Sequence, residues 1–122
     1  MTTARGELKA AARQLEEHGW KQGAYGNYSQ GACCAAGAVL KVEERQRGMW
    51  VAAEELRDFD SLPGKAIKRL SKFLRQRGLA ARKVPTLQDH HDVVVKWNDA
   101  DGRTKLEVIQ ALRGASKKRS KW

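Results

Sequence analysis

The sequence has few cysteines and no long apolar run, and each shortage argues against a class of protein. Its two cysteines, Cys33 and Cys34, are adjacent. They cannot supply the spaced disulfides of a small secreted domain, so a reducing cytosol fits better. No apolar run approaches the roughly 20 residues of a membrane span. The N-terminus also lacks the charged-then-apolar pattern of a secretion signal. We therefore expect a cytoplasmic protein that does not bind membranes.

The sequence also lacks the short motifs of common enzyme classes. It has no phosphate-cradling glycine-rich loop, no Gly-x-Ser-x-Gly nucleophile motif and no His-Glu-x-x-His metal motif. The adjacent cysteines do not have the Cys-x-x-Cys spacing of metal or redox sites. The polar loop 98–102 lacks the alternating oxygen ligands of a calcium loop. We expect a non-enzymatic protein without a cofactor or a bound metal.

The adjacent cysteines and two adjacent histidines leave one chemical role open. A fold could bring Cys34, His91 and Asp99 together as nucleophile, base and orienting group, although nothing in their spacing requires it. His90 and His91 would point apart on either a helix or a strand. A buried structural role is more common for cysteines in apolar surroundings, and we favour that role for Cys33 and Cys34.

Charge is distributed very unevenly along the chain. Of the net +10, residues 1–61 contribute −1, from 8 basic and 9 acidic residues. Residues 62–122 contribute +11, from 16 basic and 5 acidic residues. This asymmetry is typical of proteins with a polyanionic partner, most often nucleic acid. The alternative is a solvated charged surface that has no partner.

Apolar residues recur at helical spacing, so we predict an all-α class: a single compact domain of five or six short helices over residues 1–115, followed by a basic tail at 116–122. The expected helices cover residues 7–18, 32–44, 50–59, 63–77 and 105–113. The helix at 32–44 is rich in small residues and is expected to be the central buried one. Residues 84–97 fit either a helix or a short strand. We favour the helix because no second strand is evident to pair with it.

Single residues are expected to close the core and to end the helices. Leu106 should face inward on the last helix, and Gly114 should stop that helix. Asn98 and Asp99 should cap backbone groups around the neighbouring tryptophan. The edges of the core are expected to be sealed by three tryptophans, Trp20, Trp50 and Trp97.

The helix at 63–77 is amphipathic, with a polar face of basic residues opposite its apolar face. No acidic residue occurs between positions 65 and 83. A rigid row of cations can neutralise several phosphates at once and release their counterions. Nothing identifies a helix that reads base edges, so we expect binding without strong sequence specificity. The residues expected to bind nucleic acid, or another partner, are Lys65, Lys68, Arg69, Lys72, Arg75, Arg77, Arg82, Lys83, Lys117, Lys118, Arg119 and Lys121.

The loop 20–31 carries three aromatic residues between its glycines, Trp20, Tyr25 and Tyr28. These rings could stack on bases or serve as anchors for a partner protein. Alternatively, Trp20 ties the loop to the core. We favour the second role because aromatic side chains near helix ends usually close a core.

Three groups of residues carry a family resemblance: Gly19-Trp20-x-Gln22-Gly23, Cys34-x-x-Gly37-Ala38, and Trp97-Asn98-Asp99 followed by Arg103-Thr104. Together they resemble a family of small uncharacterised proteins from actinobacteria and the phages that infect them. Thr104 and Glu107 also have the spacing of a capping box, so a helix should start there. The resemblance covers the two ends of the chain, and residues 42–93 match nothing we can place.

That family has no known activity, so the resemblance implies an origin and an architecture but no catalytic residues. Two functions follow as expectations. The first is a small nucleic-acid-associated protein, phage-encoded or from an actinobacterial genome. The second is a phage protein-interaction module that docks on a host protein. The sequence does not distinguish RNA from DNA, and it does not indicate an oligomeric state.

Overall fold

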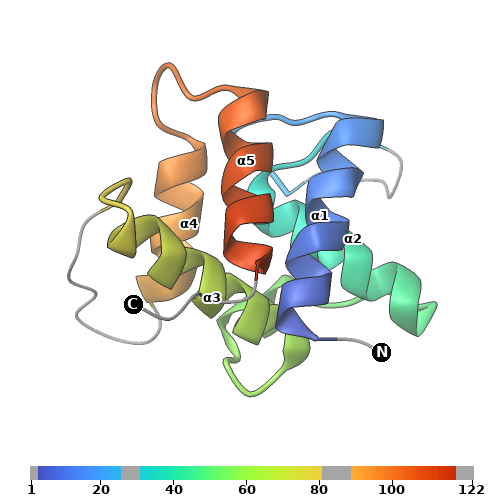
Figure 1. Ribbon diagram of the computed structural model, residues 1–122. Coiled ribbons are helices and arrows are strands. Elements are labelled where there is room, and N and C mark those ends of the chain that lie inside the picture. Colours follow the sequence, from blue (N-terminus) through green and yellow to red (C-terminus); the bar gives the residue numbers. More distant parts are fainter. Residues whose placement is uncertain (1–2, 26–30, 81–88, 118–122) are drawn as a thin grey trace.

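The computed structural model describes residues 3–25, 31–80 and 89–117, and all of the regular structure in them is helical (Figure 1). The α-helices are α1 Ala4–His18, α2 Ala35–Arg47, α3 Leu62–Gln76, α4 Asp89–Asn98 and α5 Lys105–Ser116. A short 3-10 helix, η1 Ala53–Arg57, lies between α2 and α3. An isolated bridge between Trp20 and Cys33 is the only β-type pairing in the described residues. The predicted all-α class is confirmed.

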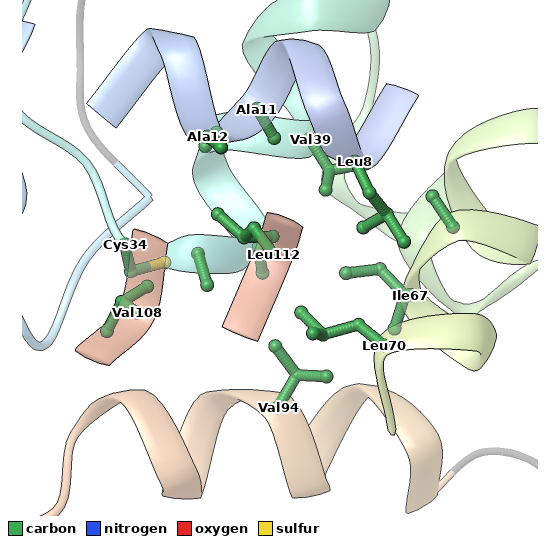
Figure 2. Close-up of a cluster of buried hydrophobic side chains, with 14 of the residues drawn as sticks. Leu8, Ala11, Ala12, Cys34, Val39, Ile67, Leu70, Val94, Val108 and Leu112 are labelled. Atoms are coloured by element: carbon green, nitrogen blue, oxygen red, sulfur yellow. The ribbon is translucent and has the colours of Figure 1, made fainter. Parts of the chain in front are cut away.

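The apolar faces of the helices meet in one core. Helix α1 packs against α2, α3 and α5, and α4 packs against α3. Figure 2 shows Leu8, Val39, Ile67, Val94 and Leu112 converging from the five α-helices. Each such side chain contributes about 1.5–3 kcal/mol when it is fully buried. Residues 35–43 of α2 are all buried, which confirms the prediction of a buried helix made of small residues.

The segment left open between helix and strand is a helix where the structure describes it. Helix α4 begins at Asp89, and residues 84–88 lie outside the described part. Val94 and Trp97 are buried one helical turn apart, so these two residues form part of a helical apolar stripe. None of the helices in the described ranges is both long and apolar enough to cross a membrane.

The expected inward position of Trp50 is wrong, and so is the helix expected at 50–59. Gly48 adopts a left-handed conformation (φ 69°) and ends α2, and the helical turn that follows is confined to η1. Val51 is buried in place of its neighbour, which leaves the Trp50 side chain 77% exposed. An extended backbone turns successive side chains to opposite sides, so only one of these two residues can point inward.

Helix α5 also differs from expectation at both ends. Leu106 is 63% exposed, because the first turn of α5 faces solvent and the buried stripe begins at Val108. Gly114 does not stop the helix, which continues to Ser116. A methyl group at Gly114 would lie 2.5 Å from Cζ of Phe73, so the glycine lets the Phe73 ring of α3 pack directly against α5.

Candidate functional site

The polar face of α3 presents its lysines outward. Lys65 and Lys72 are exposed and Lys68 is half-buried, while Leu70 and Leu74 on the other face are buried. Ser61 caps the start of the helix by accepting a hydrogen bond from the Gly64 N–H at 3.2 Å. The pattern of residues 62–76 therefore produces a rigid helix with its lysines turned to solvent.

Arg69 lies within this basic row but binds the protein itself. Its Nε donates to the Ala115 carbonyl at 2.6 Å, and its Nη2 donates to the Lys117 carbonyl at 2.9 Å. From α1, Arg5 donates through Nε to the Ser116 carbonyl at 3.1 Å. The last carbonyls of a helix have no partner within the helix, and cations there also interact favourably with the helix dipole. The two arginines therefore cap α5.

This cap fixes the position of the Lys117 backbone beside α3. Lys117 is the last described residue, and its carbonyl is held by Arg69 in the middle of the α3 row. Lys65 and Lys72 lie one turn before and one turn after Arg69 on the same helix. We call Lys65, Lys68, Lys72 and Lys117 the basic surface. Figure 1 shows the end of α5 meeting α3.

The other predicted contact residues differ in their positions. The guanidinium of Arg77 lies 5.0 Å from the centre of the Phe73 ring, and the residue is exposed. Arg75 is half-buried, and its Nε is shielded from solvent. The remaining predicted residues lie outside the described part: Tyr28, Arg82, Lys83, Lys118, Arg119 and Lys121.

A second polar site joins the loop after α1, the start of α2 and the end of α4. Its centre is Asn98, which is fully buried. Asn98 Oδ1 accepts from Trp20 Nε1 at 2.7 Å and from the Ala35 N–H at 3.0 Å. Its Nδ2 donates to the Lys21 carbonyl at 3.3 Å and to Asp99 Oδ1 at 2.9 Å. Both lone pairs and both N–H groups of this amide therefore have partners.

Neighbouring residues extend these contacts. Gln22 Nε2 donates to the carbonyls of Asn98 at 3.0 Å and Ala100 at 2.8 Å. Asp99 Oδ1 accepts from the Gly23 N–H at 2.9 Å. We call Trp20, Gln22, Gly23, Ala35, Asn98 and Asp99 the Asn98 junction. Asn98 and Asp99 thus cap backbone groups far away in the sequence, and the local capping around Trp97 that was expected is replaced by these contacts.

The rest of the motif residues support this junction. Arg103 donates through Nε to the Trp97 carbonyl at 2.8 Å, and its guanidinium lies 4.4 Å from the centre of the Trp97 ring. The capping box is present: the Glu107 N–H donates to Thr104 Oγ1, and the Thr104 N–H donates to Glu107 Oε1. The motif residues therefore join the loop between α1 and α2 to the loop between α4 and α5.

The aromatic loop contributes to the same architecture. Trp20 is half-buried with its Nε1–H bonded to Asn98, so it anchors the loop as we favoured. The Tyr25 hydroxyl pairs with His91 Nε2 at 2.7 Å. A methyl group at Gly37 would overlap the Tyr25 carbonyl, so the glycine allows the loop to lie against α2. Trp20 and Tyr25 therefore both have hydrogen-bond partners within the protein.

The two cysteines are buried thiols. Cys34 Sγ accepts a hydrogen bond from the Gly37 N–H at 3.3 Å and caps α2. Burial, followed by the nearby Cys34, raises the pKa of Cys33 to about 12. Burial also raises the pKa of Cys34. Because the thiolate is the nucleophile, both groups are poorly reactive near neutral pH.

The histidines and Asp99 bind elsewhere, so the hydrogen bonds of a Cys34–His91–Asp99 site are not formed. His91 faces Tyr25, and its Nδ1 lies 3.5 Å from Asp92 Oδ1. Burial and then the charge of Arg57 lower the pKa of His91, which favours the neutral ring. His90 points away from His91, as expected, and pairs with Ser71 Oγ of α3 at 2.8 Å.

One buried pair of acids was not predicted from the sequence. Glu7 of α1 is completely buried beside Glu43 of α2. Burial and then the neighbouring Glu43 of α2 raise the pKa of Glu7 to about 8. The carboxyl group is therefore largely protonated at neutral pH. The sequence did not predict that Glu7 would be buried, because charged residues are expected to face solvent.

The acidic and sulfur side chains do not gather into a metal site in the part of the chain that the structure describes. No group of three or more His, Cys, Asp or Glu side chains there could hold a metal ion. In the calcium-like loop, Asn98 and Asp99 are already bonded within the Asn98 junction.

Comparison with known proteins gives one match. A family of unknown function (DUF6197) matches residues 1–118. No curated protein and no solved structure matches the chain significantly. The family match includes residues 42–93, so our expectation that the resemblance is limited to the two ends is wrong, and the basic helix lies within the family domain. Because the match covers nearly the whole sequence, the chain belongs to this family of unknown function.

Proposed function

We propose that this protein binds the phosphate backbone of nucleic acid through the basic surface, without strong sequence specificity. The observation that carries the proposal is the contact of Arg69 with the Lys117 carbonyl. It joins the start of the basic tail to the middle of the α3 row. The lysines of a rigid helix face and Lys117, whose backbone is held at this face, can contact phosphates together.

Charge supports the same conclusion. Residues 62–80 carry six basic side chains and no acidic one, so no carboxylate of this segment competes with phosphate. Arg69 is bonded to backbone carbonyls, while Lys65 and Lys72 are exposed to solvent and Lys68 is half-buried. Lysines on a rigid helix release condensed counterions when they meet phosphates, and this release drives binding.

The proposed setting is the cytoplasm of an actinobacterium, where the protein is encoded by the genome or by an infecting phage. The motif resemblance supports this origin, and the buried free thiols are compatible with a reducing compartment. We propose no catalytic step, because both thiols are buried and the Cys34 side chain caps α2.

The test is a titration of nuclease-treated protein into labelled duplex DNA, single-stranded DNA and structured RNA at three salt concentrations. A variant with Lys65→Glu, Lys68→Glu and Lys72→Glu should bind at least about tenfold more weakly. Its plot of log affinity against log salt should be shallower by about 2 to 3. The three ligands also distinguish RNA from DNA and duplex from single strand.

A matched control separates local charge from total charge. The variant Arg13→Glu, Lys96→Glu, Lys105→Glu changes the net charge equally, at exposed positions on α1, α4 and α5. It should retain most of the wild-type salt dependence. Equal losses in both variants, or unchanged binding by the α3 variant, would contradict the proposal.

The alternative is a phage module that docks on a host protein. The same lysines could meet an acidic protein surface, because carboxylates and phosphates both pair with ammonium groups. A host protein that still co-purifies after nuclease treatment at moderate salt, and is lost in the α3 variant, would favour this alternative. Trp20 and Tyr25 add no support to it, because both side chains are bonded within the fold.

A further inference from the structure

Two large apolar side chains are exposed side by side in the sequence, at the turn between α2 and η1. Met49 is 63% exposed and Trp50 is 77% exposed. A tryptophan side chain buries on the order of 200 Å² when a partner covers it. An exposed tryptophan can therefore contribute strongly to the free energy of binding. Its burial in the core was expected, and the structure turns it outward instead.

The turn that carries these residues is held rigidly. The Gly48 and Met49 N–H groups both donate to the Glu44 carbonyl, at 2.8 and 3.2 Å. On the other side, the Val51 N–H donates to Glu44 Oε2 at 3.1 Å, and the Val51 side chain is buried. The backbone is therefore fixed immediately before and after Trp50, so little entropy remains to be lost when a partner covers the ring.

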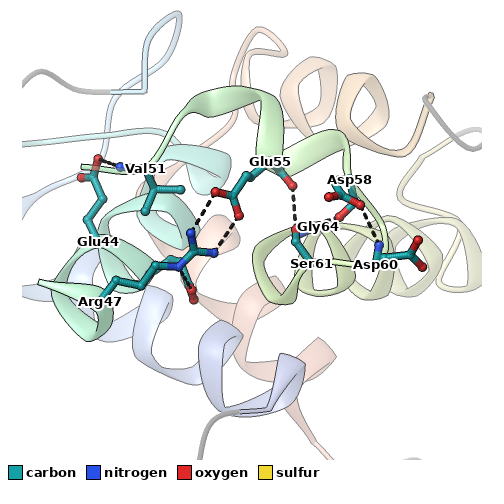
Figure 3. A network of polar contacts seen from close by, with 9 residues as sticks. Glu44, Arg47, Val51, Glu55, Asp58, Asp60, Ser61 and Gly64 are labelled. Carbon is teal, nitrogen blue, oxygen red and sulfur yellow. Dashed lines mark hydrogen bonds and ion pairs between the residues drawn. The ribbon is translucent and has the colours of Figure 1, made fainter. Parts of the chain in front are cut away.

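An ion-pair network stabilises the base of the turn (Figure 3). Arg47 donates to both carboxylate oxygens of Glu55 in η1, at 2.9 and 2.6 Å, and also pairs with Glu43. Bidentate pairs of this kind fix geometry as well as adding energy. They join the end of α2 to η1, so the two helical segments that flank Trp50 cannot separate easily.

The charge around this turn is opposite in sign to that of the basic surface. Residues 41–61 contain four basic and six acidic residues, a net charge of −2. The basic ones are engaged: Arg47 with Glu55, Arg57 with Asp92 at 3.2 Å, Lys41 with Glu44 at 3.9 Å, and Arg45 with Gln14. Phosphates would be repelled here, so a stacking platform for nucleic acid, which needs a cationic groove, does not fit.

From these observations we propose that Met49 and Trp50 form an anchor for a second protein, whose surface offers an apolar pocket flanked by Lys or Arg side chains. A preorganised tryptophan surrounded by polar residues is the usual composition of an interface hot spot. The acidic residues around the turn, Glu54 among them, would meet the basic side chains of the partner. This anchor is independent of the basic surface and of the nucleic acid proposed to bind there.

The probe is a display library of genomic fragments from the source organism, selected on the full-length protein after nuclease treatment. Trp50→Ser is the counter-selection target. Fragments enriched on the wild type should bind Trp50→Ser at least about tenfold more weakly, as expected for an anchor residue. Glu54→Lys should weaken the same fragments about threefold or more, because it places like charges against the partner.

Two controls separate the anchor from other effects. Leu106→Ser removes another side chain that is 63% exposed, on α5, and should leave fragment binding unchanged. The variant with Lys65, Lys68 and Lys72 changed to Glu should also retain the fragments, so a failure of nucleic-acid binding would not affect this result. Because Trp50 is exposed, Trp50→Ser should keep the wild-type unfolding temperature.

Several outcomes would overturn the proposal. Failure to enrich any fragment would contradict the proposal that Met49 and Trp50 form an anchor. Equal binding of the enriched fragments to the wild type and to Trp50→Ser would contradict it as well. Concentration-dependent dimers in sedimentation, lost in Trp50→Ser, would assign the turn to a second copy of this chain. Weakened nucleic-acid binding in Trp50→Ser would assign it to the nucleic-acid surface.

Discussion

The Asn98 junction and the basic surface both depend on polar groups, but these groups face the protein in one region and solvent in the other. At the junction, Asn98, Trp20 and Gln22 bond to groups of the same protein across loops distant in sequence. On α3, the lysines point to solvent. The residues that carry the family resemblance gather at the first region, and the charge of the chain gathers at the second. Shared motifs can therefore report how a fold closes, while the surface that we propose to bind nucleic acid is formed by other residues.

The largest effect is expected from breaking the junction. Asn98→Ala removes the acceptor of Trp20 Nε1 and of the Ala35 N–H, and it also leaves the Lys21 carbonyl without its donor. Leaving these groups without hydrogen-bond partners should lower the free energy of unfolding by roughly 3 kcal/mol. Chemical denaturation would measure it. Lys72→Ala is the control and should change stability by less than about 0.5 kcal/mol. A loss at Asn98 no larger than the control would show that the junction is dispensable.

The next effect concerns Glu7, a buried polar group outside both regions. Its pKa is about 8 in the folded protein against an ordinary value of 4.5, so the folded state holds an extra proton between these values. The contribution of Glu7 to stability is therefore complete below about pH 4.5 and is lost as the pH rises through about 8. We expect the free energy of unfolding to fall by on the order of a few kcal/mol across this window.

Urea denaturation of wild type and Glu7→Gln from pH 5 to 8.5 would measure this effect. The variant cannot ionise, so its stability should exceed that of the wild type increasingly toward high pH. The comparison isolates Glu7 from His91, whose lowered pKa makes stability fall toward low pH instead. Parallel curves for the two proteins would show that Glu7 titrates normally.

A smaller effect is expected at Arg69, a basic residue of α3 whose side chain bonds within the protein. Arg69→Lys keeps the positive charge but loses the planar fork that reaches two carbonyls of α5. It should destabilise the protein by about 1–2 kcal/mol. It should also weaken nucleic-acid binding, because the start of the tail is no longer held beside α3. Thermal unfolding and the titration described above measure the two losses. If Arg69→Lys had wild-type stability and wild-type nucleic-acid binding, Arg69 would act only through its positive charge.

The smallest response is expected from the cysteines. Because burial raises the pKa of both thiols, iodoacetamide at pH 8 should alkylate Cys33 and Cys34 at least about 100-fold more slowly in the folded protein than in denaturant. Mass spectrometry over time gives the rates. Rapid modification of Cys34 in the folded state would reopen the hypothesis of a cysteine nucleophile.

Local signals in the sequence predicted much of the secondary structure. Helix α3 was expected at 63–77 and is found at Leu62–Gln76, because its apolar stripe and Pro63 in the first turn agree. The capping box at Thr104 and Glu107 was also predicted, since both partners lie within one turn. Helix α4 was ambiguous because a run of valines satisfies both helix and strand periodicity.

Contacts between distant residues could not be predicted in the same way. Asn98 meets Ala35 across 63 positions, and Arg5 meets Ser116 across 111. No local pattern encodes either pair, so the structural use of Arg69 and the meeting of α3 with the tail were missed. Trp50 was misplaced for another reason. Hydrophobicity favours burial, but it does not say which of two adjacent apolar residues an extended turn will direct inward.

The capping of α5 by Arg5 and Arg69 has a practical consequence for how the protein is handled. The hydrogen bond between Arg5 and the Ser116 carbonyl joins the first turn of α1 to the last turn of α5. A shortened version of the protein that lacks Arg5 would therefore lose a cap of α5 as well as the start of α1. Truncated proteins for binding assays should keep Arg5 together with the last turn of α5.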